Sequence, residues 1–283
     1  MIKVFSKTTY FADHDRRKHD IDVINAFADG IKCIGDDVKI VDGDYEDCDI
    51  AVILYSPRDD LSYPETIRRE IYLKHRPKDI IIIETPIYRG LRQIYWRVGY
   101  NHVSRKADFR NKNCPSDRWK SWKVKLKNWK RGKYIIVCGQ LPGDYSLDGI
   151  DIDEWCENTI REIKLRTNRP IIFRPHPRYY EKRSKICFDL QSASISKISL
   201  EEDLNRAYCF VTYSSGSAVD AVINGTPSIS LSESNMAWDV SFHSLDDLDK
   251  MTYKDRTQWA YNLAYTQWTT DEIRKGLAWK HLR

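Results

Sequence analysis

The sequence predicts an α/β fold built from two similar halves, and three observations lead to this expectation. Short apolar runs alternate with stretches of helical period, which is the rhythm of a parallel sheet with its connecting helices. The same rhythm restarts near residue 134, after a strongly charged segment. With 283 residues, the chain is long enough for two modest domains, each with its own core. We therefore expect two Rossmann-like domains that face each other across a cleft, followed by C-terminal helices.

The first half contains four apolar runs of the length of buried strands and two helical stretches. In order they are the strand IKVF at 2–5, a helix around 20–33, the strands VKIV at 38–41 and IAVILY at 50–55, a helix around 64–75 and the strand IIIIE at 80–84. Together with part of the charged segment, they predict a first domain over residues 1–128.

The second half repeats the pattern and predicts a domain over residues 129–255. Its elements are YIIVCG at 134–139, a helix around 152–166, PIIFRPHP at 170–177, SKIS at 196–199, a helix at 200–207, CFVTYS at 209–214, a helix from 215 and SISLS at 228–232. Residues 256–283 then read as helices that pack back on the first domain, with one helix from Thr257 to Trp268 and Thr270 as the N-cap of another.

Basic charge is concentrated in residues 86–133, here called the basic segment. It holds fifteen Lys and Arg residues against two acidic residues, a net charge of +13, and since the whole chain carries +5, the remainder carries −8. Eight aromatic residues are interleaved with these charges. Such a composition suits a surface that binds polyanions, and it also suits a solvated linker between domains. Both interpretations stay open at this stage.

Two motifs follow predicted strands of the second half and could bind phosphate. In Arg174-Pro175-His176-Pro177, the prolines fix the backbone and present a guanidinium and an imidazole. In Ser214-Ser215-Gly216-Ser217, hydroxyls and backbone N–H groups meet at the start of a predicted helix, although ordinary capping by serine gives the same pattern.

Two further residues could contact a ligand at this edge of the predicted sheet because of their position. Asp220 lies near the start of the same helix, where it could accept a ribose hydroxyl or simply favour the helix dipole. Gln140 begins a Gly/Pro loop that leaves the strand at 134–139.

A His-Pro motif and a Ser-Ser motif in this order resemble the GT-B glycosyltransferases of bacterial capsule and lipopolysaccharide synthesis, such as polysialyltransferases and Kdo transferases. This resemblance covers residues 134–232 and implies that His176, Ser214 and Ser215 bind the phosphate of a nucleotide-sugar. The predicted donor-binding residues are then Arg174, His176, Ser214, Ser215, Gly216, Asp220 and Gln140. Residues 129–255 would form the donor domain and residues 1–128 the acceptor domain.

A looser resemblance points to the glycosyltransferases of bacteriophages that modify hydroxymethylated pyrimidines in DNA. It rests on Ala107-Asp108-Phe109, on VCGQLPGD and on the ending AYTQWTTDEI…GLAW. Duplex DNA as the acceptor would also account for the basic segment, because its phosphates need neutralising. The residues expected to contact DNA are Arg89, Arg92, Arg105, Lys106, Arg118, Lys123, Lys125 and Lys127.

The favoured expectation is an inverting transfer of a sugar from a nucleotide-sugar to a hydroxymethylated pyrimidine in phage DNA. A carbohydrate acceptor of capsule or lipopolysaccharide and a non-catalytic nucleic-acid-binding module are the alternatives. A UDP-sugar is favoured over a CMP-sugar. No metal or other cofactor is expected to be required, since cations and helix N-termini can hold the pyrophosphate; a stimulatory Mg²⁺ stays open.

The catalytic residues expected are His176, for the leaving phosphate, and a carboxylate of the first half that takes the acceptor's proton. Asp13 follows the first strand and Glu84 ends the strand at 80–84. The acidic catalytic motif of polysialyltransferases is missing from this half, so both stay candidates. His19 and Asp20 are less favoured because they could simply open a helix.

Several other classes of protein lose support because their signatures are missing. The sequence has no GxGxxG after a strand, no GxxxxGK[ST], no HExxH and no GxSxG. Asp151-Ile152-Asp153 has the form of a metal-binding DxD, but acidic residues at the start of a helix explain it. No apolar stretch is long enough to span a bilayer, and the N-terminus does not read as a signal peptide, which predicts a cytoplasmic protein, in the host if a phage encodes it.

Overall fold

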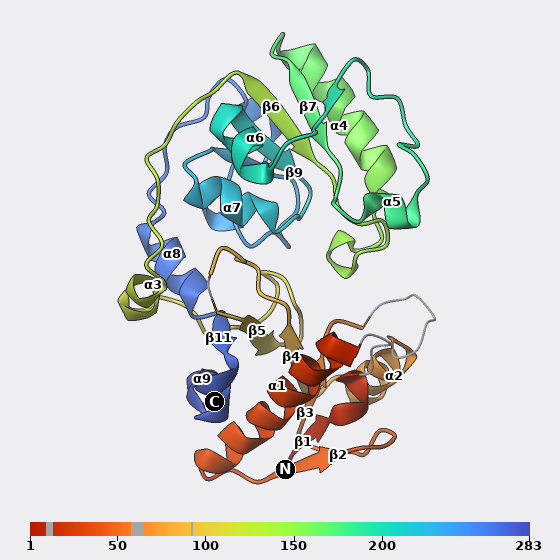
Figure 1. Ribbon diagram of the computed structural model, residues 1–283, viewed down its shortest axis with the longest axis vertical. Helices are drawn as coiled ribbons and strands as arrows, with labels where there is room; N and C mark the ends of the chain where they lie inside the picture. The colour runs from red at the N-terminus through yellow and green to blue at the C-terminus, as the bar shows by residue number, and fades with distance from the viewer. Residues whose placement is uncertain (10–13, 58–64, 92) are drawn as a thin grey trace. The chain divides into compact units, whose positions relative to one another are not determined.

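The computed structural model describes residues 1–9, 14–57, 65–91 and 93–283 (Figure 1). The chain forms two compact units, which are described separately below. The first unit comprises Met1–Trp122 and Ala260–Arg283, and the second unit comprises Lys123–Trp259. Each unit contains one sheet. The end of the chain thus belongs with the first unit, and the basic segment is divided between the two.

The sheet of the first unit has six strands in the order β11-β5-β4-β3-β1-β2. Its strands are β1 (Ile2–Phe5), β2 (Val38–Val41), β3 (Ile50–Leu54), β4 (Asp79–Glu84), β5 (Tyr95–Tyr100) and β11 (Gln267–Thr269). The strands β1 to β4 pair in parallel and confirm the four predicted strands. The strand β5 runs antiparallel between β4 and β11.

The strand β5 lies inside the basic segment, where the sequence predicted no strand. Its residues YWRVGY are mostly buried, including Arg97 and Gly99. A side chain at Gly99 would collide with the ring of Phe109, so glycine is required where this ring lies against the strand. For residues 95–100, the interpretation of the basic segment as a solvated linker was therefore wrong.

Successive strand residues point to opposite faces of the sheet, and helices pack against it. The first unit contains η1 (Ser6–Thr9), α1 (His14–Cys33), α2 (Glu65–His75), α3 (Asp117–Trp122), α9 (Thr270–Arg274) and α10 (Leu277–Leu282). The helices α1, α9 and α10 pack with Val52, Leu54, Ile81 and Ile83 in one apolar cluster. Among the described residues, no helix is long and apolar enough to cross a membrane.

The C-terminal tail differs from the predicted long helix. The helix α8 (Thr257–Ala264) ends early, and the chain then enters the short strand β11. Thr269, rather than the predicted Thr270, is the N-cap of α9 and forms a capping box with Glu272. The helix α9 crosses α1 at Gly30, where any Cβ would overlap the carbonyl oxygen of Ile273. The local periodicity of the sequence could not reveal that the helix ends before β11. This strand forms because it pairs with β5 at the edge of the sheet, and β5 lies far away in sequence.

The sheet of the second unit has five parallel strands in the order β10-β9-β6-β7-β8. Its strands are β6 (Tyr134–Cys138), β7 (Ile171–Arg174), β8 (Ser194–Ile195), β9 (Ala207–Thr212) and β10 (Ser228–Ser230). Its helices are η2 (Tyr145–Leu147), α4 (Ile152–Arg166), α5 (Tyr179–Lys182), α6 (Leu200–Arg206), α7 (Ser217–Ile223), η3 (Trp238–Val240) and η4 (Leu245–Asp247). The strand β8 lies slightly before the predicted 196–199, whereas the other predicted strands are confirmed.

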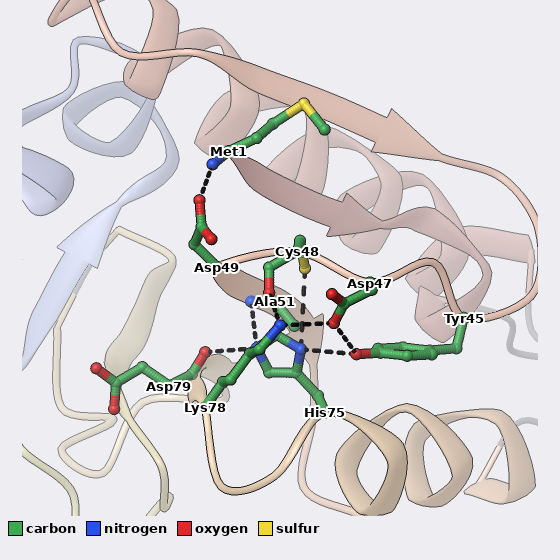
Figure 2. Close-up of polar contacts among 9 residues, drawn as sticks. All are labelled: Met1, Tyr45, Asp47, Cys48, Asp49, Ala51, His75, Lys78 and Asp79. Carbon is green, nitrogen blue, oxygen red and sulfur yellow. Dashed lines mark hydrogen bonds and ion pairs between the residues drawn. The ribbon is translucent and has the colours of Figure 1, made fainter.

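His75 ties two strands together at the amino edge of the first sheet, as Figure 2 shows. Its ring is 1% exposed. The Nε2 atom lies 3.2 Å from the backbone N of Ala51 and 3.1 Å from the carbonyl oxygen of Asp79. The Nδ1 atom lies 3.2 Å from the hydroxyl of Tyr45 and 3.9 Å from the thiol of Cys48.

The neutral ring carries one proton, and two arrangements fit its neighbours. The hydroxyl of Tyr45 lies 3.0 Å from Asp47, whose carboxylate can only accept, so the hydroxyl proton goes there. With its proton on Nδ1, the ring donates to Tyr45 and Nε2 accepts from the N–H of Ala51; with its proton on Nε2, the ring donates to the carbonyl of Asp79. A doubly protonated ring would place a donor against the N–H of Ala51.

We expect the free energy of unfolding to fall as the pH drops below about 6.5. Burial lowers the pKa of His75 below its ordinary value of 6.5, so the unfolded chain gains a proton there that the folded chain does not. Denaturant unfolding of the wild type and of His75→Gln between pH 8 and pH 5 measures this contribution. The stability gap between them should shrink by up to about 1.4 kcal/mol per pH unit.

The second buried histidine needs its own control, since burial also lowers the pKa of His281. The variant His281→Gln should keep the part of the pH slope that His75 causes. Parallel pH curves for the wild type and His75→Gln would contradict the assignment.

Candidate functional site

Three adjacent strands of the second sheet end side by side, and the predicted motifs follow them. In the central strand β6, Cys138 pairs with Arg174 of β7 on one side and with Thr212 of β9 on the other. The loops after these strands therefore leave the same carboxyl edge of the sheet. In open parallel sheets this edge is where ligands bind. It brings Gln140, His176 and the Ser214–Ser215 pair to one place.

The side chain of Arg174, the last residue of β7, forms hydrogen bonds within the second unit. Its Nη1 donates to the carboxylate of Asp203 at 2.8 Å, to the hydroxyl of Ser196 at 3.0 Å and to the carbonyl of Ile198 at 2.8 Å. The Asp203 side chain is fully buried, whereas that of Arg174 is 18% exposed. A buried carboxylate needs such a partner, because its charge is otherwise poorly solvated. Arg174 thus forms a structural ion pair that joins β7 to α6, and its predicted phosphate contact stays a prediction.

His176 lies half-buried in the loop after β7. Its Nδ1 accepts a hydrogen bond from the backbone N–H of Arg178 at 3.1 Å. The neutral ring therefore carries its proton on Nε2, which makes that atom a donor. The loop is anchored further along, where Asp153 accepts from Tyr179 at 2.7 Å and from Arg183 at 3.1 Å. The fold thus places an imidazole in the loop after β7, and its contact with a donor phosphate stays a prediction.

The two serines after β9 differ in their surroundings. The hydroxyl of Ser214 lies within 3.2 Å of groups of both Gln140 and Ser146. The hydroxyl of Ser215 accepts from the N–H of Ser217 at 3.3 Å. Burial raises the pKa of the Cys138 thiol, and hydrogen bonding to Ser215 and Ser217 partly offsets this.

The helix that follows them is short. Gly216 is the N-cap of α7, without a side-chain cap hydrogen bond. Asp220 is half-buried in the first turn of this helix, as predicted. Because α7 spans only seven residues, its dipole contributes less than the sequence suggested.

At the carboxyl edge of the first sheet, Glu84 ends β4 and is half-buried. One carboxylate oxygen accepts from the backbone N and the hydroxyl of Thr85, at 2.8 and 3.1 Å, and the other accepts from the N of Ser56 at 3.2 Å. Glu84 therefore joins the ends of β3 and β4. The other predicted base, Asp13, lies outside the described residues.

Sequence reasoning gave little weight to Asp20 and missed Arg68, although both lie buried at this edge. Asp20 is 1% exposed and accepts from the hydroxyl of Tyr55 at 2.7 Å. Arg68 is 2% exposed, donates twice to the carbonyl of Thr8 at 2.8 and 2.9 Å, and lies 5.0 Å from the ring of Tyr55. The spacing of these residues in the sequence indicated the burial of Arg68. Arg68, Ile71 and His75 lie on one face of the helix, and this is the buried face of α2.

Tyr55 follows β3 in a left-handed backbone conformation with φ of 68°. Such a conformation costs a residue with a side chain about 1 kcal/mol or more, and it often marks a functional site. Burial and the neighbouring Asp20 raise the pKa of the Tyr55 hydroxyl well above its usual range. The hydroxyl therefore stays protonated and keeps donating to Asp20.

The basic segment passes from the first unit into the second between Trp122 and Lys123, so its charges belong to two separate units. Arg118 is 9% exposed, forms an ion pair with Glu272 at 2.7 Å and lies 3.8 Å from the ring of Trp268. Trp129 stacks on Tyr253 in the second unit. The predicted DNA contact of Arg118 is thus corrected, since its charge holds the C-terminal tail in place.

The remaining predicted DNA contacts divide between the units. Arg89, Arg105 and Lys106 are exposed on the first unit, and Lys123, Lys125 and Lys127 are exposed on the second. Lys127 pairs with Glu201 at 3.2 Å. Arg92 lies outside the described residues. The second unit as a whole holds twenty Lys and Arg residues against nineteen Asp and Glu residues, so its net charge is only +1.

The DxD sequence is explained by helix geometry. Asp151 is the N-cap of α4 and accepts from the backbone N of Asp153 and of Glu154. Asp153 anchors Tyr179 and Arg183, as described above. Within the described ranges, no three His, Cys, Asp or Glu side chains gather in a way that could hold a metal ion.

Comparison with solved structures identifies the fold. The chain aligns with the KpsC β-Kdo 2,7 transferase of Thermosulfurimonas dismutans at a TM-score of 0.52 and 12% identity, covering 98% of each chain. The KpsC β-Kdo 2,4 transferase of the same organism gives a TM-score of 0.51 and 12% identity, covering 94% of this chain and 91% of that chain. No protein-family model and no curated protein sequence matches. The predicted fold class, α/β of the GT-B type with two Rossmann-like domains, is confirmed.

Proposed function

We propose that this chain is a glycosyltransferase that moves a sugar from a nucleotide-sugar to a carbohydrate acceptor of the capsule or lipopolysaccharide class. The observation that carries the proposal is the position of the His-Pro and Ser-Ser motifs. They follow β7 and β9, the two neighbours of the central strand β6, in a chain that shares its fold with two Kdo transferases. This second candidate from the sequence now has more support than a DNA acceptor.

The donor site would lie at the carboxyl edge of the second sheet. The Nε2–H of His176 and the N–H and hydroxyl groups around Ser215 and Gly216 would donate to the phosphate oxygens. As the bond between sugar and phosphate breaks, negative charge grows on the leaving phosphate, and these donors stabilise it. Both UDP- and CMP-sugars remain donor candidates, since no contact described above reads the base.

The acceptor hydroxyl would lose its proton to a carboxylate of the first unit while its oxygen attacks the anomeric carbon. Glu84 and Asp13 are the two proposed bases. A single displacement of this kind inverts the anomeric centre, so the configuration of the product, determined by NMR, tests it. Retention would contradict a single inverting displacement and would give these carboxylates a different role.

Duplex DNA with hydroxymethylated pyrimidines remains a second candidate acceptor. Lys123, Lys125 and Lys127 favour it, because they are exposed at alternate positions, with the partly buried Val124 and Leu126 between them. The small net charge of the second unit weighs against a large polyanion surface. A DNA acceptor would bind more weakly as the salt concentration rises, whereas a neutral oligosaccharide would not.

The first test is transfer by the full-length chain. The protein is incubated with UDP- and CMP-sugars, with and without Mg²⁺, and with capsule or lipopolysaccharide oligosaccharides or with hydroxymethylated and unmodified duplex DNA. Mass spectrometry of the acceptor and release of the nucleotide are followed together. We expect a sugar-shifted oligosaccharide. A shifted hydroxymethyl nucleoside would instead support the DNA acceptor.

The negative outcomes are also informative. DNA binding without binding of any nucleotide would support the third alternative, a nucleic-acid-binding module on a transferase fold. Nucleotide release without a modified acceptor would indicate donor hydrolysis and would leave only the donor half of the proposal standing.

A further inference from the structure

The two adjacent serines after β9 are not equivalent, and proton counting distinguishes them. Ser214 is 7% exposed, and its hydroxyl lies 2.8 Å from the carbonyl oxygen of Ser146. A carbonyl can only accept, so the single proton of the Ser214 hydroxyl goes there. The Ser214 oxygen then accepts from the side-chain amide of Gln140 at 3.0 Å. This hydroxyl has no proton left for a phosphate oxygen.

The side-chain amide of Gln140 also has all its hydrogen-bonding groups occupied. Its carbonyl oxygen accepts from the backbone N–H of Ser214 at 2.8 Å. Its two amide protons point to the hydroxyls of Ser214, at 3.0 Å, and of Ser146, at 3.1 Å. The proton of the Ser146 hydroxyl goes to the carboxylate of Asp144 at 2.7 Å. Gln140, Asp144, Ser146 and Ser214 thus form a closed network, here called the clamp, in which every side-chain proton already has an acceptor.

The clamp joins the loop after β6 to the loop after β9. Gln140 is 5% exposed, so this connection is shielded from water. Hydrogen bonds in such a place hold geometry well, because water cannot easily replace them. The clamp fixes where the backbone turns at Ser214, and hence where Ser215 and Gly216 lie.

The Ser215 hydroxyl differs, because its proton faces a weak partner. Its oxygen accepts from the N–H of Ser217 at 3.3 Å, and within the described residues no carbonyl or carboxylate oxygen accepts its proton. The thiol of Cys138, whose pKa is raised by burial and lowered less strongly by Ser215, is the group that interacts with it. A thiol is a poor acceptor compared with an anionic oxygen. The Ser215 proton can therefore turn to a phosphate at little cost.

We propose that Ser215 contacts the donor phosphate, whereas Gln140 and Ser214 are positioning residues that hold the turn in place. This inference rests on the proposed function, and it changes two predicted donor contacts into indirect roles. Loss of the clamp would loosen the phosphate site without removing a ligand. Loss of the Ser215 hydroxyl would remove a ligand and leave the turn intact.

Double-mutant cycles on the full-length chain separate the two roles, with UDP and CMP as probes in calorimetric titrations. We expect Ser215→Ala to weaken nucleotide binding about tenfold, the effect of losing one hydrogen bond to a charged group. Gln140→Met and Ser214→Ala should each weaken binding by about threefold to tenfold, since each opens the same network. The double variant Gln140→Met/Ser214→Ala should be little worse than either single variant, whereas Ser215→Ala should add to Gln140→Met.

A buried glutamine of the first unit supplies the matched control. Gln267 is fully buried and bonds to both backbone groups of Tyr88, so Gln267→Met should lower the thermal midpoint about as much as Gln140→Met. Nucleotide affinity should stay at the wild-type value in this control. A merely structural role of Gln140 would make the two variants alike in both measurements.

The possible failures are distinct. Additive losses for Gln140→Met and Ser214→Ala, with an unchanged affinity for Ser215→Ala, would overturn the assignment while leaving the glycosyltransferase proposal intact. A wild-type chain that binds neither UDP nor CMP would overturn both.

Discussion

Replacing His176 with alanine is expected to lower kcat for sugar transfer by about 10²- to 10³-fold, the usual loss when one donor to a developing negative charge is removed. The hydrogen bond from Arg178 to Nδ1 fixes the ring so that Nε2 carries the proton. Alanine removes this donor. Initial rates with saturating acceptor, measured over a range of donor concentrations, give kcat and KM separately.

The matched control for this variant is His243→Ala in the same unit. His243 is exposed, stacks on Trp238 with 3.6 Å between ring centres and bonds to its carbonyl. It follows β10 rather than β7, and we expect its removal to change kcat less than threefold or so. A His176→Ala enzyme with wild-type kcat and an intact fold would exclude this histidine from the chemistry.

Replacing Arg174 with methionine is expected to lower the free energy of unfolding by about 3–5 kcal/mol, because it leaves the carboxylate of Asp203 buried without its partner. The double variant Arg174→Met/Asp203→Asn should recover most of this loss, since the asparagine carries no charge. Chemical denaturation of the wild type, both single variants and the double variant measures the coupling between the two residues.

An exposed arginine serves as the comparison for this result. Arg166 pairs with Glu162 and Asp246 on the surface, so Arg166→Met should cost less than about 1 kcal/mol. If Arg174→Met were as stable as the wild type but bound no nucleotide, the original interpretation of Arg174 as a phosphate ligand would be right and the structural role wrong.

The contrast between Arg174 and His176 shows how far a motif can be read. Both residues stand in one four-residue sequence, and both have side chains that suit a phosphate. Only the structure shows that Asp203, far along the chain in α6, takes up the Arg174 charge. A partner that is so distant in sequence leaves no local trace, so the motif predicted the loop after β7 but not the ion pair within it.

The basic segment shows that composition alone does not determine what charged residues do. Their roles depend on where folding places them. Its charges are contiguous in sequence, and this favoured one polyanion surface. In the structure, Arg97 lies within β5, Arg118 is buried against the C-terminal tail and Lys123 begins the other unit. Charges that are contiguous in sequence therefore have different roles after folding, and they are divided between two units.

The sequence by itself determined the two sheets, most of their strands and the loops that carry the His-Pro and Ser-Ser motifs. These features depend on local apolar runs and on the residues that follow each strand. Such patterns are determined by residues close together in sequence, so the sequence alone is enough to predict them. Only the tertiary structure decided that β5 and β11 join the first sheet and that Asp20 and Arg68 lie buried at its edge. It also decided that the hydroxyl proton of Ser214 is already bound to an acceptor oxygen, whereas that of Ser215 is not. Each of these depends on a partner from a remote part of the chain, and hydrogen bonds and burial become definite only when folding brings those partners together.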